Sequence, residues 1–183
     1  MKKLIPLAAL ASLSVAAPTS AEVVPSSGGG FASSHSATVA TDLQQTWRAL
    51  VHPEDWWTHS WSGEMRNFTL DPRAGGCFCE RLPPTVDGFG PGSAEHMRVV
   101  NVQPGQMLRM VGALGPLQSE GLSGTLTVTL EPVEQGTRIT WEYVLGGQSR
   151  IPLDGIAGVV DSVQAEFLGG LVQSLGGAVE QGG

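Results

Sequence analysis

Lysine is absent from this 183-residue chain after position 3, and the whole sequence has only 10 basic side chains against 17 acidic ones. Proteins that bind nucleic acid or anionic membranes need a basic face to neutralise phosphates. The shortage of basic residues therefore excludes those partners. Glycine and proline, with 25 and 12 residues, stay below the share of roughly 25–30% that is typical of low-complexity disorder. We expect one globular domain with many turns.

Cysteine is also scarce: the chain has two, Cys77 and Cys79. They flank Phe78 on a predicted strand, so both lie on one face with Cα atoms near the limit of about 7 Å for a disulfide. Three interpretations stay open: a local disulfide or two unreactive thiols, a redox pair, or soft-metal ligands completed by a histidine. No second pair of Cys or His residues stands at metal-motif spacing, so no metal site is expected.

Motifs for common cofactors and nucleophiles are missing as well. The chain has no phosphate loop, no zinc-protease helix and no nucleophile elbow, and the glycines at 28–30 are not followed by a helix. We expect no cofactor.

The first 21 residues have the features of a secretory signal peptide. Lys2 and Lys3 precede an apolar run, and small residues at Thr19 and Ala21 favour cleavage after Ala21. The run is shorter than the roughly 20 apolar residues that span a bilayer, and no later stretch is expected to cross one. The mature chain would keep 8 arginines and 17 carboxylates, a formal charge of −9. A soluble periplasmic or secreted protein, without stable membrane insertion, follows.

The mature chain divides into a flexible leader (22–32), one domain (33–176) and a flexible tail (177–183). After a first strand that ends near Val39, residues 41–44 have the form of a capping box, and apolar residues then recur at helical spacing. This helix stops at His52-Pro53, because the residue before proline avoids the helical region.

Strand patterns separated by glycine and proline turns occupy the middle of the chain. In the last two strands apolar and polar residues alternate, so one face of each is buried. The loop 132–136 has the length and composition of a hairpin turn, which favours an antiparallel meander. The predicted strands are Glu64–Leu70, Gly76–Leu82, Ala94–Val102, Met107–Ala113, Leu122–Glu131 and Thr137–Leu145.

From Leu153 onward the apolar period returns to that of a helix, with Asp154 as a candidate cap. A helix of roughly 20 residues would be about 30 Å long. Its four glycines each cost about 1 kcal/mol relative to alanine, so packing against the sheet must stabilise it.

The order of these elements and several sequence motifs resemble those of the polyketide cyclase and START-like (SRPBCC) superfamily. The motifs are VATDLQQTWRALVHPEDWW, LDPRAGGCFCERL, VVNVQPGQMLRM and LTVTLEPVEQGTRITWEY, followed by the closing helix. The branch most similar to the chain is named after the activator of the heat-shock-protein ATPase. The resemblance implies an α+β helix-grip fold, in which a curved antiparallel sheet of about six to seven strands wraps around the C-terminal helix, with short helices after the first strand.

The resemblance also implies a hydrophobic cavity between sheet and helix that takes a lipid, polyketide or similar molecule. Aromatic and apolar residues on the expected inner surfaces are the candidate ligand contacts. Packing in an ordinary core is the alternative, most strongly for Trp47 and also for the three tryptophans that follow it. The candidates are Trp56, Trp57, Trp61, Phe78, Met110, Trp141, Tyr143, Val163, Phe167 and Leu171.

Ionisable residues inside predicted strands are the candidates for chemistry. Glu80, His96 and Arg98 would form an acid/base or anion-anchoring set if they faced inward. Alternation keeps Glu95 and His96 on opposite faces and places Arg98 with His96. The alternative is that these charges lie on the solvent face, since unpaired charges are rarely buried. Glu142 is the weakest candidate, because its neighbours occupy the apolar face.

Three functions follow. The first is an exported binding protein that shelters an apolar small molecule. The second is a cyclase or dehydratase that uses His96 or Glu80 as a base and needs no cofactor. The third, a chaperone-ATPase co-regulator, comes from the branch name and conflicts with the export signal, since the partner ATPase is cytosolic. The sequence leaves the ligand and the oligomeric state open.

Overall fold

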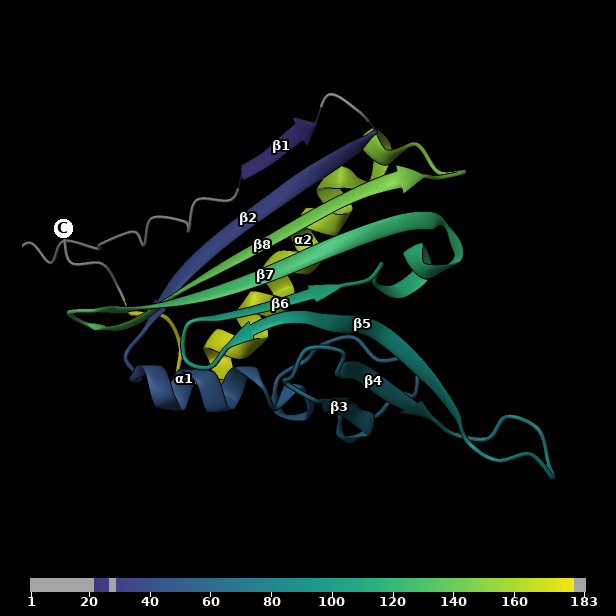
Figure 1. Ribbon diagram of the computed structural model, residues 1–183, viewed down its shortest axis with the longest axis horizontal. Coiled ribbons are helices and arrows are strands. Elements are labelled where there is room, and N and C mark those ends of the chain that lie inside the picture. Colours follow the sequence, from purple (N-terminus) through teal and green to yellow (C-terminus); the bar gives the residue numbers. More distant parts are fainter. Residues whose placement is uncertain (1–21, 27–28, 180–183) are drawn as a thin grey trace, which may run out of the picture.

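The structure, a computed structural model, describes residues 22–26 and 29–179. One antiparallel sheet has the strand order β1-β2-β8-β7-β6-β5-β4-β3, and the long helix α2 crosses one of its faces (Figure 1). The predicted helix-grip fold is confirmed, with short helices following β2. The elements are β1 (Glu22–Ser26), β2 (Gly30–Val39), α1 (Leu43–Leu50), η1 (Pro53–Asp55), η2 (Met65–Asn67), β3 (Phe68–Leu70), β4 (Cys77–Leu82), β5 (Gly92–Gln103), β6 (Met107–Val111), η3 (Gly115–Ser119), β7 (Gly121–Val133), β8 (Gly136–Gln148) and α2 (Leu153–Ser174).

The segment 22–32, which the sequence predicted as a flexible leader, contains β1 and the start of β2. Strand β1 pairs antiparallel with β2, with Glu22 opposite Ser34, so the sheet has one strand more than expected. The edge of β2 offers free backbone donors and acceptors to any extended segment, whatever its side chains. Composition alone therefore did not reveal this pairing. The predicted signal peptide lies outside the described residues.

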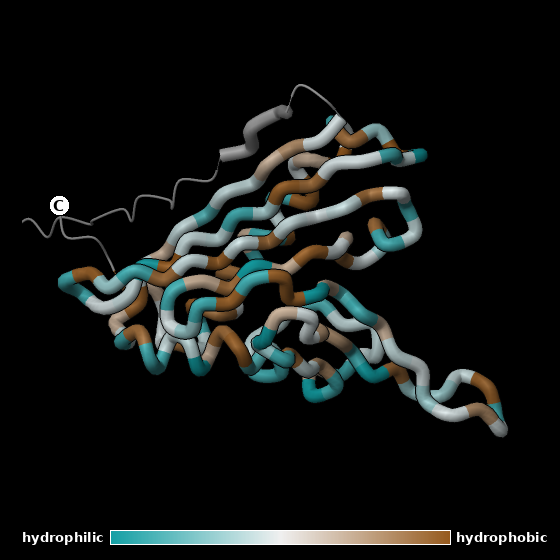
Figure 2. The backbone as a smooth tube through the Cα atoms, viewed as in Figure 1, coloured by the Kyte–Doolittle hydropathy of each residue, from teal (hydrophilic) through white to brown (hydrophobic). Residues whose placement is uncertain are grey.

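The hairpin of β7 and β8 forms the centre of the sheet, as the alternating sequence predicted. Leu126, Val128, Trp141 and Tyr143 are all buried on the inner face, while Glu142 is exposed on the outer face. Apolar and polar positions alternate along these strands (Figure 2). This inner face supplies the surface on which α2 packs.

Strand β5 departs from regular alternation at two bulges. Phe78 pairs with Met97 but Cys79 pairs with Glu95, so His96 is an extra residue; a second register shift lies between Val99 and Asn101. A bulge changes which face the following side chains occupy. His96 and Met97 are therefore both buried.

Helix α1 begins one residue later than the capping-box prediction implied. Asp42, rather than Thr41, is the N-cap, and its carboxylate accepts a hydrogen bond from the Gln45 N–H at 2.7 Å. The helix ends at Leu50, before Pro53, as predicted.

Helix α2 packs unevenly along its length. Its buried residues, from Gln164 to Val172, all belong to the C-terminal half, whereas Val159 in the N-terminal half is 67% exposed. Pro152 is the N-cap, and the Asp154 carboxylate accepts instead from the Gly155 N–H at 3.0 Å.

By length and composition α2 is also apolar enough to cross a membrane, contrary to the sequence-based expectation for the mature chain. A core helix of a folded domain meets the same criteria, and the C-terminal half of α2 is buried against the sheet. The first residues of the expected flexible tail also pack: Ala178 forms a bridge with Val39.

Candidate functional site

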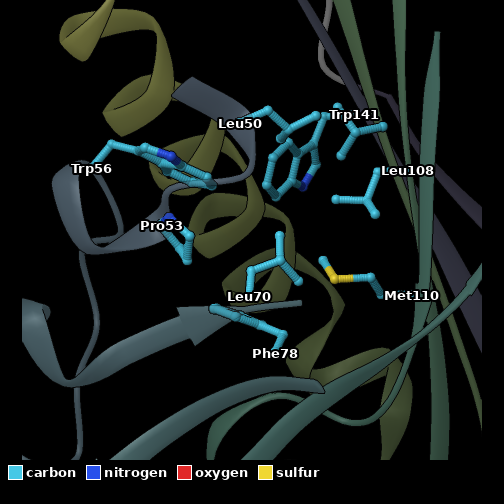
Figure 3. Close-up of a pocket in the computed structure, with 9 residues that line it drawn as sticks. Leu50, Pro53, Trp56, Leu70, Phe78, Leu108, Met110 and Trp141 are labelled. Carbon is cyan, nitrogen blue, oxygen red and sulfur yellow. The ribbon is translucent and has the colours of Figure 1, made fainter. Parts of the chain in front are cut away.

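The space between the sheet and the segment after α1 is filled by side chains. Four candidate ligand contacts, Trp56, Phe78, Met110 and Trp141, surround a cavity of only about 10 Å³ (Figure 3). A single water molecule needs at least about 10–15 Å³. These residues therefore form packed core at this place. The other lining residues are Leu50, Pro53, Leu70, Leu108 and Val128.

The tryptophans after α1 connect this segment to α2 and the sheet. The Trp57 ring stacks on Phe167 of α2, with centroids 3.8 Å apart, and meets Phe78 edge-on at 4.7 Å. Trp56 donates from Nε1 to the Ala49 carbonyl at 2.8 Å. Trp61 differs, because half of it is exposed.

The remaining candidate contacts are distributed along the seam between β8 and α2. Tyr143 and Leu171 are fully buried, and Val163 is half-buried. Burial raises the pKa of the Tyr143 hydroxyl to about 12, so this group stays protonated and can act as a donor.

Glu80 and His96 meet on the inner face, as the cyclase hypothesis requires. His96 Nε2 lies 2.9 Å from Glu80 Oε2, and the two residues are 5% and 0% exposed. The loop after η1 supplies three more donors to the carboxylate: Ser60 Oγ at 2.7 Å, Ser62 N at 2.6 Å and Trp61 N at 3.1 Å. The Glu80 carboxylate therefore accepts four hydrogen bonds.

The surroundings decide the protonation of this pair. Burial raises the pKa of Glu80, but hydrogen bonds from Ser62, Ser60 and the loop backbone outweigh it and lower the pKa to about 2. Burial lowers the pKa of His96, against the opposing effect of Glu80. Glu80 is consequently ionised and too weakly basic to accept a proton in a reaction near neutral pH. His96 donates from Nε2 to Glu80, which leaves its Nδ1 as the unprotonated nitrogen of the neutral ring.

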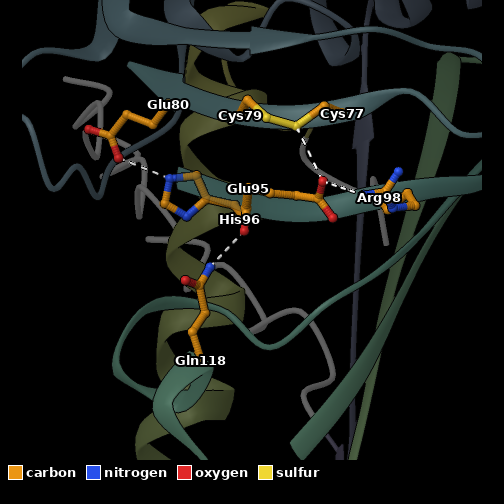
Figure 4. The surroundings of a disulfide bond; sticks show 7 residues. All are labelled: Cys77, Cys79, Glu80, Glu95, His96, Arg98 and Gln118. Atoms are coloured by element: carbon orange, nitrogen blue, oxygen red, sulfur yellow. Dashed lines mark hydrogen bonds and ion pairs between the residues drawn. A yellow bond between two sulfur atoms is a disulfide. The ribbon is translucent and has the colours of Figure 1, made fainter. Parts of the chain in front are cut away.

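Arg98 does not join this pair, contrary to the predicted alternation, because the bulge at His96 turns Arg98 to the outer face. There its Nη2 donates to Glu95 Oε2 at 2.6 Å (Figure 4). Cys77 and Cys79 lie on the same outer face and form a disulfide, with Cα atoms 5.4 Å apart. Of the open interpretations for the cysteines, the structure has the local disulfide.

A second polar cluster, which the sequence did not predict, joins β2 to α2. Asp161 Oδ1 accepts from Ser33 Oγ at 2.5 Å and lies 2.9 Å from His35 Nε2. Ser33 and His35 are 1% and 4% exposed, and the Asp161 side chain is 17% exposed. We call Ser33, His35 and Asp161 the β2–α2 cluster.

The β2–α2 cluster contains the residue types of a hydrolase triad but not its arrangement. In a triad the histidine separates the two partners, so that one ring nitrogen accepts the serine proton while the other donates to the carboxylate. Here the serine donates directly to the carboxylate, and the same histidine nitrogen contacts both partners. The cluster therefore orients Asp161 rather than activating Ser33.

A groove of about 620 Å³ opens between the start of α2 and the adjacent ends of β2 and β8. This volume lies within the range of roughly 300–1,000 Å³ that is typical of small-molecule sites. The N-terminal half of α2, which is the less buried half, forms one wall. The groove is lined by Gly29, Gly30, Phe31, Gly147, Gln148, Ser149, Ile151, Pro152, Leu153, Asp154 and Ala157.

A curved antiparallel sheet that grips one long helix, with a groove at their shared end, defines the helix-grip class of domains. Within that class, residues 31–176 match the family described as polyketide cyclase / dehydrase and lipid transport, and the chain belongs to this family. The family implies a fold that binds hydrophobic small molecules.

Solved structures share the fold at low sequence identity. Protein MLL2253 from Mesorhizobium loti is 21% identical, with a TM-score of 0.53 over 79% of this chain and 96% of that one. A putative uncharacterized protein from Rhizobium leguminosarum is 18% identical, with a TM-score of 0.57 over 87% and 99%. A Staphylococcus aureus protein of unknown function is 11% identical, with a TM-score of 0.59 over 82% and 96%. The search of curated proteins found no match.

Proposed function

We propose that this chain is an exported protein that holds an apolar small molecule in the groove at the start of α2. The observation that carries the proposal is the contrast between two spaces: the cavity in the packed core has about 10 Å³, whereas the groove has about 620 Å³. Apolar side chains from both walls, including Phe31, Ile151 and Leu153, line the groove. A lipid or polyketide would bury its apolar part there.

Export rests on the sequence of residues 1–21 and directs the search for the ligand to the cell envelope. Protein purified from the exporting organism should retain its ligand. Native mass spectrometry, followed by solvent extraction, would detect it as an added mass.

Blocking the groove with a large side chain tests this proposal, and a substitution elsewhere on the same helix is the matched control. Ala157 lines the groove, whereas Ala165 is exposed on the same helix. Ala157→Phe should abolish ligand retention, and Ala165→Phe should leave it unchanged. Equal retention by both variants would contradict binding in the groove.

A cyclase or dehydratase is the second candidate, and one observation favours it: the neutral His96 faces inward beside the ionised Glu80. In this mechanism His96 would be the base and Glu80 would position it. A cyclised or dehydrated product, formed from a linear polyketide by the unaltered chain and lost in His96→Gln, would support it. Recovery of the compound unchanged would support binding alone. Neither His96 nor Glu80 lines the groove, which favours the binding function.

A further inference from the structure

The β2–α2 cluster lies beyond the groove along the same two elements, and none of its three residues belongs to the groove lining. Phe31 lines the groove, and Ser33 follows two residues later on the same face of β2. Ala157 lines the groove, and Asp161 follows four residues later on the same side of α2. A ligand that fills the groove and extends one turn further along α2 would bring one end to Asp161.

Asp161 has one carboxylate oxygen engaged and one available. Both Ser33 and His35 contact Oδ1, whereas Oδ2 receives no hydrogen bond from the residues that the structure describes. Because the two buried partners fix the orientation of the carboxylate, Oδ2 is held in place. A partly buried carboxylate of this kind binds most strongly to a cationic donor.

The charged side chain in the groove lining is acidic. The lining residues include Asp154 but no arginine, lysine or histidine. Arg150, which stands between two lining residues in the sequence, is already paired: its Nη2 donates to Glu120 Oε1 at 2.7 Å, and its Nε lies 3.2 Å from the same oxygen. A ligand carboxylate would therefore meet like charge at Asp161 and Asp154.

The first turn of α2 would by itself favour an anion, since helix N-termini carry partial positive charge. Asp154 is in that turn and bonds the Gly155 N–H, so the chain itself supplies the negative charge there. The remaining preference in the groove is for a cation.

We infer that the groove binds an apolar ligand with a protonated amine at one end, and that Asp161 pairs with this amine. The inference rests on the proposed function and adds the ligand class: a cationic amphiphile rather than a fatty acid. The apolar part of the ligand would lie against Phe31, Ile151 and Leu153.

Three probes of equal chain length test the ligand class on the unaltered chain. Decylamine, decanol and decanoate differ only in the polar end, and isothermal titration calorimetry at pH 7 gives each affinity. We expect decylamine to bind at least about tenfold more tightly than decanol, and decanoate to bind most weakly. An affinity for decanoate equal to or above that for decylamine would overturn the inference.

Two variants separate this inference from the proposed function. Asp161→Asn should reduce decylamine affinity about tenfold and change decanol affinity less than about twofold, while Asp87→Asn in the exposed β4–β5 loop should change neither. Circular dichroism checks that Asp161→Asn folds; if it does not, the three-probe comparison decides. Loss of all binding in Ala157→Phe with unchanged decylamine affinity in Asp161→Asn would leave the groove in place and refute the amine. Unchanged binding of every probe in Ala157→Phe would refute the groove itself.

Discussion

Glu80 shows how a buried charge is accommodated in this domain. Its carboxylate is fully buried, yet four donors surround it, three of them from the loop at residues 60–62. A buried carboxylate is tolerated only when such partners replace water. Glu80 thus joins that loop to the inner face of β4. The loop is held in this position by hydrogen bonds to the ionised carboxylate.

Glu80→Gln should therefore destabilise the protein. The new amide group presents hydrogens to at least one of the four donors, which leaves a buried donor unsatisfied. We expect a loss of about 3 kcal/mol in the free energy of unfolding, measured by urea denaturation at pH 7. Glu95→Gln, on the exposed face of the neighbouring strand, should cost less than about 1 kcal/mol.

Acid gives an independent readout of the same residue. Because the pKa of Glu80 falls from 4.5 to about 2 on folding, its stabilisation is complete above pH 4.5 and is lost as the pH falls toward 2. The difference between the unaltered chain and Glu80→Gln should shrink over that interval. A constant difference would show that the charge of Glu80 is not involved.

His96 predicts a second pH dependence, at higher pH. Its pKa is lowered from 6.5 in the folded protein, so the unfolded chain binds more protons as the pH falls below 6.5. The free energy of unfolding should be at its full value above pH 6.5 and decrease below it. His96→Gln should flatten this slope, whereas His52→Gln, at an exposed histidine, should not. Parallel slopes for the unaltered chain and His96→Gln would contradict the lowered pKa.

At the scale of the elements, two adjacent glycines in α2 have opposite roles. A Cβ at Gly169 would meet nothing within 4 Å, whereas a Cβ at Gly170 would overlap the Trp56 carbonyl oxygen. Gly169→Ala should therefore stabilise the protein by about 1 kcal/mol through helix propensity. Gly170→Ala should destabilise it by about 2 kcal/mol, because the segment at Trp56 must move away from the helix. Thermal unfolding of both variants tests this, and stabilisation by both would contradict the close approach.

The strands and helices could be predicted because their burial follows regular periods. Strand β8 buries every second side chain from Thr137 to Leu145, β7 buries Leu126, Val128 and Leu130 on its inner face, and the period of α2 begins at Leu153, where the helix starts. The bulge at His96 could not be predicted, because it depends on how β5 pairs with β4. That one extra residue reversed the expected facing of Arg98.

The candidate site was harder to predict than the fold. The expectation that certain strand residues face inward identified Glu80 and His96 as candidates. It does not distinguish a residue that lines a cavity from one that fills the core. Trp56 and Phe78 belong to the second kind. Ser33 and His35 stand at strand spacing, which was a usable signal for a shared face. Their partner Asp161 is 126 residues from His35 in the sequence, and only the folded chain brings them together.

On the scale of the whole molecule, the lack of lysine has two consequences. After Lys3 the chain has eight arginines and no lysine, and several of these arginines are already paired with carboxylates, including Arg98 and Arg150. Its net negative charge favours solubility and repels anionic surfaces. The same imbalance attracts cations, in keeping with an amine ligand for the groove.

Both lysines precede the predicted cleavage point, and strand β1 begins at Glu22, the first residue after it. Removal of residues 1–21 would keep all of the described strand β1, which pairs with β2 at the edge of the sheet. We expect protein isolated from the envelope of exporting cells to begin at Glu22, as measured by N-terminal sequencing and intact mass. A chain that lacks residues 2–21 should fold with the same circular dichroism spectrum and stay in the cytosol. Full-length protein that remains in the cytosol with Lys2 and Lys3 still attached would refute export and reopen the chaperone-partner hypothesis.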